Sequence, residues 1–406
     1  MKYYIIAGEA SGDLHGSNLI KALRQQDNNA QIRCWGGDLM EQAGGQLVKH
    51  YRDLAFMGFV EVIKNLPTIW RNFRECKADI QQFEPDALLL IDYPGFNLRM
   101  AQWAKKNGYR VFYYISPQVW AWKSGRVKQM KRDIEHLFVI LPFEEAYFKQ
   151  QWQWQSVTFV GHPLLDALDL KHTTPLSADV LGLPSDDDNR PIIALLPGSR
   201  RQEIAQMLPQ MLAIVPFFPQ YRFVVAGAPA IPAELYRHFL DIAGNSVFLC
   251  RNQTHELLSM ATAAIVTSGT ATLETALFGV PQVVCYKGNP ISYQLARYWI
   301  KVRYISLVNL ILDRPAVCEL IQHELTTERL KNELQAILPP MDNHYHYHYH
   351  HPNNDGDATA SNISDSNTNS RQRLLDDYRQ LHQLLGGGGA SERTAEAIQK
   401  LCEQQI

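Results

Sequence analysis

The chain has 406 residues and a formal net charge of −2, with 46% hydrophobic and 20% charged residues. This length exceeds one typical hydrophobic core and predicts two globular domains. The near-neutral charge provides no basic field, so the sequence predicts no nucleic-acid partner. The 6 cysteines form no CxxC pair, which favours a reducing compartment over a disulfide framework.

The start of the chain and its apolar runs bear on location. Met1 and Lys2 lead directly into a strand-like run, so we expect no secretory signal. No uncharged apolar stretch reaches the roughly 18 residues of a membrane-spanning helix. The sequence therefore predicts a soluble cytoplasmic protein, for which any membrane contact is peripheral.

Short apolar runs alternate with amphipathic stretches in both halves of the chain. Such alternation is typical of doubly wound α/β sheets with parallel strands. Two sets predict two Rossmann-like domains, residues 1–165 and 166–340, joined near 161–188 and facing a cleft at the carboxyl ends of their strands. Strands are expected at 3–7, 87–91, 111–115, 137–141, 157–160, 192–196, 223–226, 247–249, 263–266 and 282–286, with helices over 96–106 and 271–277.

The C-terminal part differs from the body. Residues 341–370 contain the tract HYHYHYHH and then mostly Asn, Asp, Ser and Thr, which predicts a disordered surface insertion. We interpret the histidines as part of a solvated loop rather than as a metal site. Residues 371–406 regain a helical apolar stripe and predict a helical tail that docks on the body.

The stretch LPGSRRQE (196–203) joins a predicted strand to a helix. A helix that starts after Gly198 and Ser199 directs free N–H groups and its dipole toward an anion. Arg200 adds a guanidinium that suits phosphate, and Glu203 lies in the same turn. The alternative is an ordinary capped turn with surface arginines. No GxxxxGK[ST] motif is present, so ATP chemistry is not indicated.

A second turn of this kind follows in TSGTATLE (267–274). Its small residues, Ser268, Gly269, Thr270 and Ala271, allow a diphosphate to approach the backbone. Glu274 lies one helical turn further and can accept hydrogen bonds from ribose hydroxyls. The alternative is a Ser/Thr-rich helix cap. Together, the two turns predict a nucleotide diphosphate site in the second half.

The first half carries carboxylates at the ends of its strands. GEASGDLHG (8–16) is not a GxGxxG fingerprint, and its Glu9 and Asp13, with Ser11 between them, suit sugar hydroxyls better than phosphate. Asp92, in IDYPGFN (91–97), ends an apolar strand, where partial burial would raise its pKa and suit a general base. The alternative is an Asp that caps the next helix.

Two further stretches of the first half are strongly apolar. The stretch YYISPQVWAWKSGR (113–126) contains Ser116, Trp120 and Trp122, and the tryptophans either pack in the core or form a wall against a sugar or acyl chain. Residues 54–73 include Met57 and end near Trp70. They predict either a buried helix, which the residues alone favour, or a membrane-facing surface.

In this order, the motifs resemble those of the lipid-A-disaccharide synthases, bacterial glycosyltransferases of the GT-B type. The matching stretches are GEASGD (8–13), MGFVEV (57–62), IDYPGFN (91–97), YYISPQVWAW (113–122), LPFE (141–144), VGHPLLD (160–166), LPGSRRQE (196–203), SGTATLE (268–274), SLVNLI (306–311) and the tail GASERTAEAI. The insertion at 341–370 is not a family feature, and Val308 stands where the family has a proline.

The resemblance implies a reaction. UDP-2,3-diacylglucosamine donates its sugar, with inversion, to the 6-hydroxyl of 2,3-diacylglucosamine 1-phosphate, without a metal or other cofactor. The first domain then binds the acceptor and the second binds UDP. The resemblance also implies work at the cytoplasmic face of the inner membrane, which favours the membrane-facing interpretation of 54–73, and a homodimer that exchanges C-terminal segments.

For this reaction, the residues themselves indicate individual roles. Asp92 is the candidate base, with Glu9 as the second choice. Arg200 and the two helix N-termini meet the leaving UDP. The remaining candidates line the two substrate sites: Ser199, Glu203, Glu274, Tyr286 and Asn309 for UDP, and Ser11, Asp13, Met57, Asn97, Ser116, Trp120, Trp122 and His162 for the acceptor and its acyl chains. For His162, packing at the hinge between the domains is an equal alternative.

Two other functions remain open on the sequence. One is another UDP-sugar enzyme of the same fold, such as a UDP-N-acetylglucosamine 2-epimerase, which needs no lipid surface. The other is a non-catalytic UDP-sugar-binding protein, for which Asp92 would be dispensable.

Overall fold

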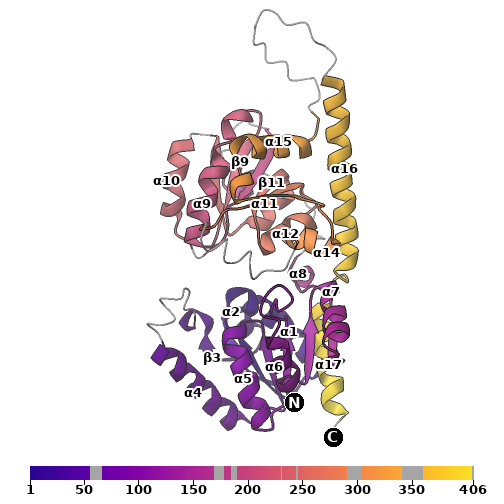
Figure 1. The fold of residues 1–406 in the computed structure, drawn as a ribbon. Coiled ribbons are helices and arrows are strands. Elements are labelled where there is room, and N and C mark those ends of the chain that lie inside the picture. Colours follow the sequence, from indigo (N-terminus) through magenta and orange to yellow (C-terminus); the bar gives the residue numbers. More distant parts are fainter. Residues whose placement is uncertain are drawn as a thin grey trace, which may run out of the picture. The chain divides into compact units, whose positions relative to one another are not determined.

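The computed structural model describes residues 1–54, 66–168, 178–183, 190–229, 231–243, 246–289, 303–340 and 360–404 (Figure 1). The chain divides into two compact units. Unit 1 comprises Met1–Asp169 and Gln383–Ile406, and unit 2 comprises Leu170–His382. The first crossing between the units thus falls after Asp169, four residues beyond the end predicted for the first domain.

Unit 1 is built on a 7-stranded parallel sheet with the order β3-β2-β1-β4-β5-β6-β7. Its strands are β1 (Lys2–Ala7), β2 (Gln31–Gly36), β3 (Gln46–His50), β4 (Ala87–Ile91), β5 (Val111–Tyr114), β6 (His136–Val139) and β7 (Val157–Phe159). Its helices are α1 (Ala10–Gln26), α2 (Asp38–Gln42), α4 (Leu66–Phe83), α5 (Pro94–Lys106), α6 (Arg126–Asp133), α7 (Pro142–Ala146), α8 (Leu164–Ala167) and α17 (Ala390–Glu403).

Unit 2 is built on a 6-stranded parallel sheet with the order β10-β9-β8-β11-β12-β13. Its strands are β8 (Ile192–Leu196), β9 (Arg222–Gly227), β10 (Val247–Arg251), β11 (Ala261–Thr267), β12 (Gln282–Tyr286) and β13 (Cys318–Ile321). Its helices are α9 (Arg201–Leu212), α10 (Ala233–Ala243), α11 (Thr254–Met260), α12 (Thr270–Leu277), α14 (Leu307–Leu312), α15 (Thr327–Ile337) and α16 (Ala360–Leu384), whose last residues belong to unit 1.

Each sheet is covered on both faces, which explains why its central strands are apolar throughout. In unit 1, α4, α5 and α6 pack on one face, and α1 and α17 pack on the other. In unit 2, α9, α10 and α15 cover one face and α11 and α12 the other. This arrangement confirms the predicted pair of Rossmann-like domains.

The predicted strands are present, and three strands were missed. The missed strands, β2, β3 and β13, contain polar or charged residues: QIRCWG, QLVKH and CELI. β3 and β13 lie at sheet edges, where one side of the strand is not covered by a neighbour. An apolar run is therefore not required of these two strands, and apolar runs alone do not predict them.

The C-terminal tail docks on its own chain in two parts. In unit 2, Gln282 donates a hydrogen bond to the Tyr378 hydroxyl of α16 (3.2 Å). In unit 1, Asp166 accepts hydrogen bonds from the first amides of α17, at Gly389 (2.7 Å) and Ser391 (2.8 Å). α16 begins at Ala360, so part of the predicted disordered insertion is helical, and residues 341–359 lie outside the described residues.

None of the helices in the described part of the chain combines the length and the apolar character needed to cross a bilayer. α4 is amphipathic. Phe73, Cys76 and Ile80 are buried against the sheet, whereas the Trp70 side chain is 72% exposed and Arg71 lies beside it. Residues 55–65, which include Met57 and most of the predicted membrane-facing stretch, lie outside the described residues.

Candidate functional site

Both sheets reverse their strand order at one point, and several of the candidate residues lie there. In unit 1 the reversal falls between β1 and β4, and in unit 2 it falls between β8 and β11. The loops at the carboxyl ends of two such strands diverge to opposite faces of the sheet and leave a crevice where ligands bind. Glu9 and Asp92 follow the first pair of strands, and Arg200 and Ser268 follow the second pair.

Asp92 lies in a strained turn directly after β4. Both Asp92 and Tyr93 adopt left-handed backbone conformations, with φ of 45° and 48°. For residues other than glycine, such conformations cost about 1–3 kcal/mol each and are concentrated at functional sites. Burial raises the pKa of the Asp92 carboxyl to about 6, and the negative charge of Glu9 adds to the increase. A carboxyl with this pKa is a competent base near neutral pH.

Glu9 lies across the same crevice and is exposed. It is the N-cap residue of α1, and its side chain does not cap the helix. The preceding Gly8 packs under Tyr93, because a Cβ at position 8 would lie 2.3 Å from the Tyr93 ring. The lack of a side chain at Gly8 thus lets the loops after β1 and β4 approach each other closely. Ser11, in the first turn of α1, is exposed.

Asp13 and Asn97 use their side chains within the protein. The buried Asp13 carboxylate accepts hydrogen bonds from the backbone amides of Gly37 (2.8 Å) and Met40 (3.0 Å), so it caps α2. The Asn97 side-chain amide donates to the carbonyls of Ile91 (3.1 Å) and Asp92 (2.8 Å). These contacts give both residues structural roles, which the prediction of acceptor contacts did not anticipate.

The two tryptophans of the loop after β5 have different environments. Trp120 is half-buried: its Nε1 donates to Glu144 (3.1 Å) and its ring meets Phe143 edge-on. Trp122 is 47% exposed, with the Lys123 ammonium 4.2 Å from its ring centre. Trp120 thus fits the core interpretation, whereas Trp122 does not pack in the core.

Two other candidates of unit 1 are buried. His162 accepts a hydrogen bond at Nδ1 from the Leu164 amide (3.2 Å), and burial lowers the pKa of its imidazole to about 3. Ser116 is buried, and its hydroxyl donates to the carbonyl of Pro117 (3.0 Å). A neutral, buried imidazole next to the α8 turn acts in packing rather than as an acid.

In unit 2, Glu203 organises the loop that precedes α9. Its Oε2 accepts hydrogen bonds from the amides of Ser199 (3.1 Å) and Arg200 (3.3 Å), and its Oε1 pairs with the Arg200 guanidinium (3.0 Å). Free N–H groups were predicted in this turn, and Glu203 holds these two. Ile204 donates the first amide bond of the helix, to the Arg200 carbonyl. The amides before it, from Arg201 to Glu203, have no acceptor within the helix.

The loop after β11 leaves more of its groups available. Gly269 and Thr270 are exposed, and a Cβ at Gly269 would meet no atom within 4 Å. The Ser268 hydroxyl donates to the carbonyl of Ile305 (2.8 Å). Ala271 is half-buried in the first turn of α12, and Glu274 follows one turn later. Burial raises the pKa of the Glu274 carboxyl, and among the described residues none donates a hydrogen bond to it.

Tyr286 and Asn309 are also in different situations. Tyr286 ends β12 and is 37% exposed. Asn309 is buried, and its side chain donates to Glu319 (2.9 Å) and to the carbonyl of Val317 (2.9 Å). It therefore shapes the loop that contains Ile305, the partner of Ser268, and does not expose its amide to a ligand.

Three side chains that shape these loops were not among the predicted site residues: the buried Tyr113 and Glu144, and the half-buried Glu319. Each contacts a residue remote in sequence, so spacing carried no signal.

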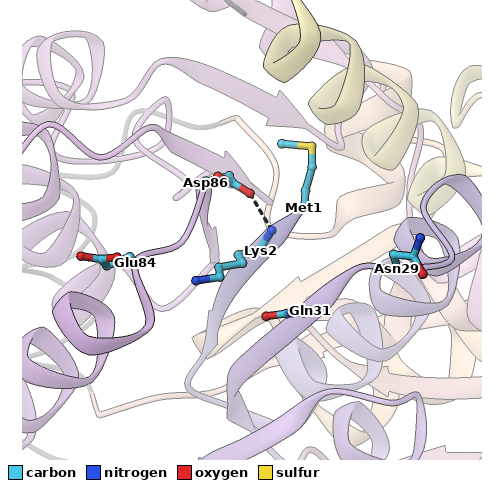
Figure 2. A pocket seen from close by; sticks show the side chains of 6 residues that line it. All are labelled: Met1, Lys2, Asn29, Gln31, Glu84 and Asp86. Carbon is cyan, nitrogen blue, oxygen red and sulfur yellow. Dashed lines mark hydrogen bonds between the residues drawn. The ribbon is translucent and has the colours of Figure 1, made fainter.

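A polar hollow of about 230 Å³ also occurs in unit 1, lined by Met1, Lys2, Asn29, Gln31, Glu84 and Asp86 (Figure 2). It lies at the amino ends of β1, β2 and β4, the opposite edge of the sheet from Asp92.

Comparison with known proteins gives a consistent result. The family model for lipid-A-disaccharide synthetase matches residues 3–366. The lipid-A-disaccharide synthase of Trichlorobacter lovleyi is 37% identical over 404 residues, which cover 98% of this chain and 97% of that protein. The lipid-A-disaccharide synthase of Coxiella burnetii is 36% identical over 345 residues, with coverage of 84% and 89%.

Solved structures resemble the chain in fold. The UDP-GlcNAc 2-epimerase of Neisseria meningitidis, solved bound to UDP-GlcNAc, has a TM-score of 0.64 at 13% identity and covers 98% of this chain and 100% of its own. The glycosyltransferase of kitacinnamycin has a TM-score of 0.58 at 13% identity, with coverage of 98% for both chains. At these identities the likeness concerns the fold alone.

Proposed function

The chain belongs to the lipid-A-disaccharide synthase family, and we propose that it transfers 2,3-diacylglucosamine from UDP to the 6-hydroxyl of 2,3-diacylglucosamine 1-phosphate. The products are a β-1,6-linked disaccharide 1-phosphate and UDP. The family match over residues 3–366 is the observation that carries this proposal. The solved epimerases share the fold at low identity, and that likeness does not favour epimerisation.

Asp92 is the proposed base. In an inverting transfer, the acceptor oxygen attacks the anomeric carbon from the face opposite UDP, and its proton passes to a base. As the new C–O bond forms, the bond to the diphosphate breaks and UDP leaves with the electron pair. Asp92 suits the role because its turn is strained and its carboxyl has a pKa of about 6. Glu9 is the second candidate; it is more exposed and better suited to hold acceptor hydroxyls.

Unit 2 is proposed to hold UDP and to stabilise the leaving diphosphate. Arg200 supplies the positive charge, and the first amides of α9 and α12 supply donors at the same edge of the sheet. The loop after β11, from Ser268 to Ala271, lets the phosphates approach the backbone. Glu274 is placed to accept hydrogen bonds from the ribose, and Tyr286 borders the site. Glu203 and Asn309 support it from behind, since their side chains bond to the loops.

The lipid-facing groups are proposed to lie in unit 1. Trp122 and Ser11 are exposed and suit the acceptor or its acyl chains. Trp70, with Arg71 beside it on α4, combines an exposed aromatic ring and a cation, which suits the surface of an anionic bilayer. On this basis we propose peripheral contact with the cytoplasmic face of the inner membrane. A homodimer that exchanges α17 would reuse the contacts of Asp166.

The test is direct. The protein is incubated with UDP-2,3-diacylglucosamine and 2,3-diacylglucosamine 1-phosphate in detergent, and the products are analysed by mass spectrometry. We expect a disaccharide 1-phosphate and UDP from the wild type and a large loss of product with Asp92→Ala and Arg200→Ala. Absence of product from folded wild-type protein, or conversion of soluble UDP-N-acetylglucosamine without detergent, would retire the proposal.

A further inference from the structure

We propose that Tyr113 is a positioning residue that holds the backbone of Asp92 in its left-handed conformation and thereby aims the Asp92 carboxylate at the acceptor. The inference rests on the proposed function, because it assumes that Asp92 is the base. Tyr113 lies in β5, next to β4, and its side chain is fully buried. Because the side chain is not accessible to a ligand, Tyr113 can contribute to the reaction only through another residue.

The contact is specific to the Asp92 backbone. The Tyr113 hydroxyl donates a hydrogen bond to the Asp92 carbonyl at 2.5 Å, and the Asn97 side-chain amide donates to the same oxygen at 2.8 Å. The Asp92 amide in turn donates to the carbonyl of Tyr114 at 3.1 Å. Both peptide groups that flank the Asp92 Cα are therefore held by hydrogen bonds to other elements.

The register of the sheet explains how this contact arises. Tyr113 is paired with Leu90 in β4, and Tyr114 is paired with Ile91. From Tyr113, a long phenol side chain reaches past the end of β4 to the peptide two residues beyond Leu90. Tyr113 packs on the face covered by α5 and α6, and Tyr114 packs on the opposite face, against α1 and α17. The two tyrosines are thus buried neighbours, and of their two hydroxyl groups it is that of Tyr113 that bonds to Asp92.

This hydrogen bond stabilises a turn whose backbone conformation is strained. A left-handed Asp followed by a left-handed Tyr persists only where the surroundings over-determine it. Two donors on one carbonyl restrict rotation about the bonds that set the direction of the Asp92 side chain. A base must lie within hydrogen-bond reach of the proton that it removes, and small errors of position cost rate. Removing one donor leaves the other in place, so the fold has no orphaned carbonyl.

The test compares Tyr113→Phe with Tyr114→Phe, a matched loss of one buried hydroxyl on the other face of the strand. For Tyr113→Phe we expect kcat to fall about tenfold or more, because misplacement of a catalytic group by about 1 Å costs up to about 10²-fold. The KM values of both substrates and the acid limb of the pH profile stay as in the wild type, since burial and Glu9 still set the pKa of Asp92. Tyr114→Phe keeps kcat within about twofold.

Two further results decide the matter. In an Asp92→Asn background, Tyr113→Phe should cause no additional loss, because Tyr113 acts through the Asp92 carboxylate. Wild-type kcat in Tyr113→Phe, equal losses in the two Phe variants, or a failure of Tyr113→Phe to fold would overturn the inference while leaving the proposed function intact. If Asp92→Asn is itself fully active, the proposed base is wrong, and the two failures are thereby distinguished.

Discussion

The crevices of the two units share a topology and differ in chemistry. In each unit, two loops flank the point where the strand order reverses. In unit 1 these loops carry two carboxylates, Glu9 and Asp92, and a backbone held in a strained conformation. In unit 2 they carry Arg200, small hydroxyl residues and free helix amides. The same topology thus presents different residues, and on the proposed function the loops of unit 1 remove a proton whereas those of unit 2 hold a diphosphate.

The largest expected effect comes from removing the base in unit 1. Asp92→Ala should lower kcat by about 10²–10⁴, the usual contribution of a positioned general base. Binding of UDP should be unaffected, because the groups proposed to bind it belong to unit 2. Initial rates of disaccharide formation check the first expectation and calorimetry with UDP checks the second. Loss of UDP binding together with activity in this variant would contradict the assignment of the base to unit 1 and of UDP binding to unit 2.

A slightly smaller effect is expected from the cation in unit 2. Arg200→Ala should lower kcat by about 10²–10³, the cost of removing one donor to a developing negative charge. Its affinity for UDP should also fall, whereas the pH profile should keep its acid limb. Arg237→Ala is a suitable control, since Arg237 is an exposed arginine on α10 that also pairs with a glutamate on its own helix. Equal effects of the two substitutions would argue against a specific role for Arg200.

The pH profile sharpens the assignment in unit 1. The base must be ionised, and the pKa of Asp92 is raised to about 6. Below pH 6, kcat/KM should therefore fall about tenfold for each unit of pH. Glu9→Gln removes the negative charge that adds to this increase, so the acid limb should move to lower pH. A profile that stays flat down to pH 4, measured on protein that is still folded at that pH, would contradict a base in this environment.

A moderate effect is expected at the ribose end of the nucleotide. Glu274→Gln should weaken UDP binding about tenfold, because a hydrogen bond to a charged acceptor contributes roughly 1.5–3 kcal/mol. The loss of affinity caused by Glu274→Gln should be smaller for 2′-deoxy-UDP than for UDP, because the deoxynucleotide lacks one of the ribose hydroxyls that Glu274 would bind. Titration of both nucleotides measures this difference. Glu328→Gln, in the first turn of α15, is a matched control on an exposed glutamate.

The smallest effect concerns stability, and here the substitution is expected to improve the measured property rather than reduce it. The folded state raises the pKa of Asp92 from 3.8 to about 6. Protonation therefore favours folding, and this stability is present below pH 4 and lost as pH rises through 6. At pH 8, Asp92→Asn should be more stable than the wild type by about 1–3 kcal/mol. Thermal unfolding at pH 8 and pH 4 checks this, and an Asn variant that is less stable at both pH values would exclude it.

The sequence predicted the fold better than it predicted individual side-chain roles. The strands at Ala87–Ile91, Ile192–Leu196 and Gln282–Tyr286 were predicted to the residue because they are mainly apolar and buried along most of their length. Loop residues such as Asp92 and Ser268 were placed at the sheet edge correctly because a polar residue directly after an apolar strand has to lie there. This reasoning places a residue at an edge but does not specify its partners.

The side chains with structural roles show where such reasoning ends. Asp13, Asn97 and Asn309 all lie in the motifs that mark the site, yet their polar groups bond to the backbone of neighbouring loops. Tyr113 and Glu144 gained their importance from contacts across the sheet edge, between segments separated in sequence. A motif thus contains both ligand-facing and loop-holding residues, and only the tertiary contacts separate them.

The central claim is that unit 2 holds UDP and unit 1 supplies the base. Calorimetric titration of UDP into the wild type, Asp92→Ala and Arg200→Ala tests it most directly. We expect the wild type and Asp92→Ala to bind UDP with the same affinity and Arg200→Ala to bind it at least about tenfold more weakly. An absence of heat with the folded wild type, or equal weakening by both substitutions, would contradict the account.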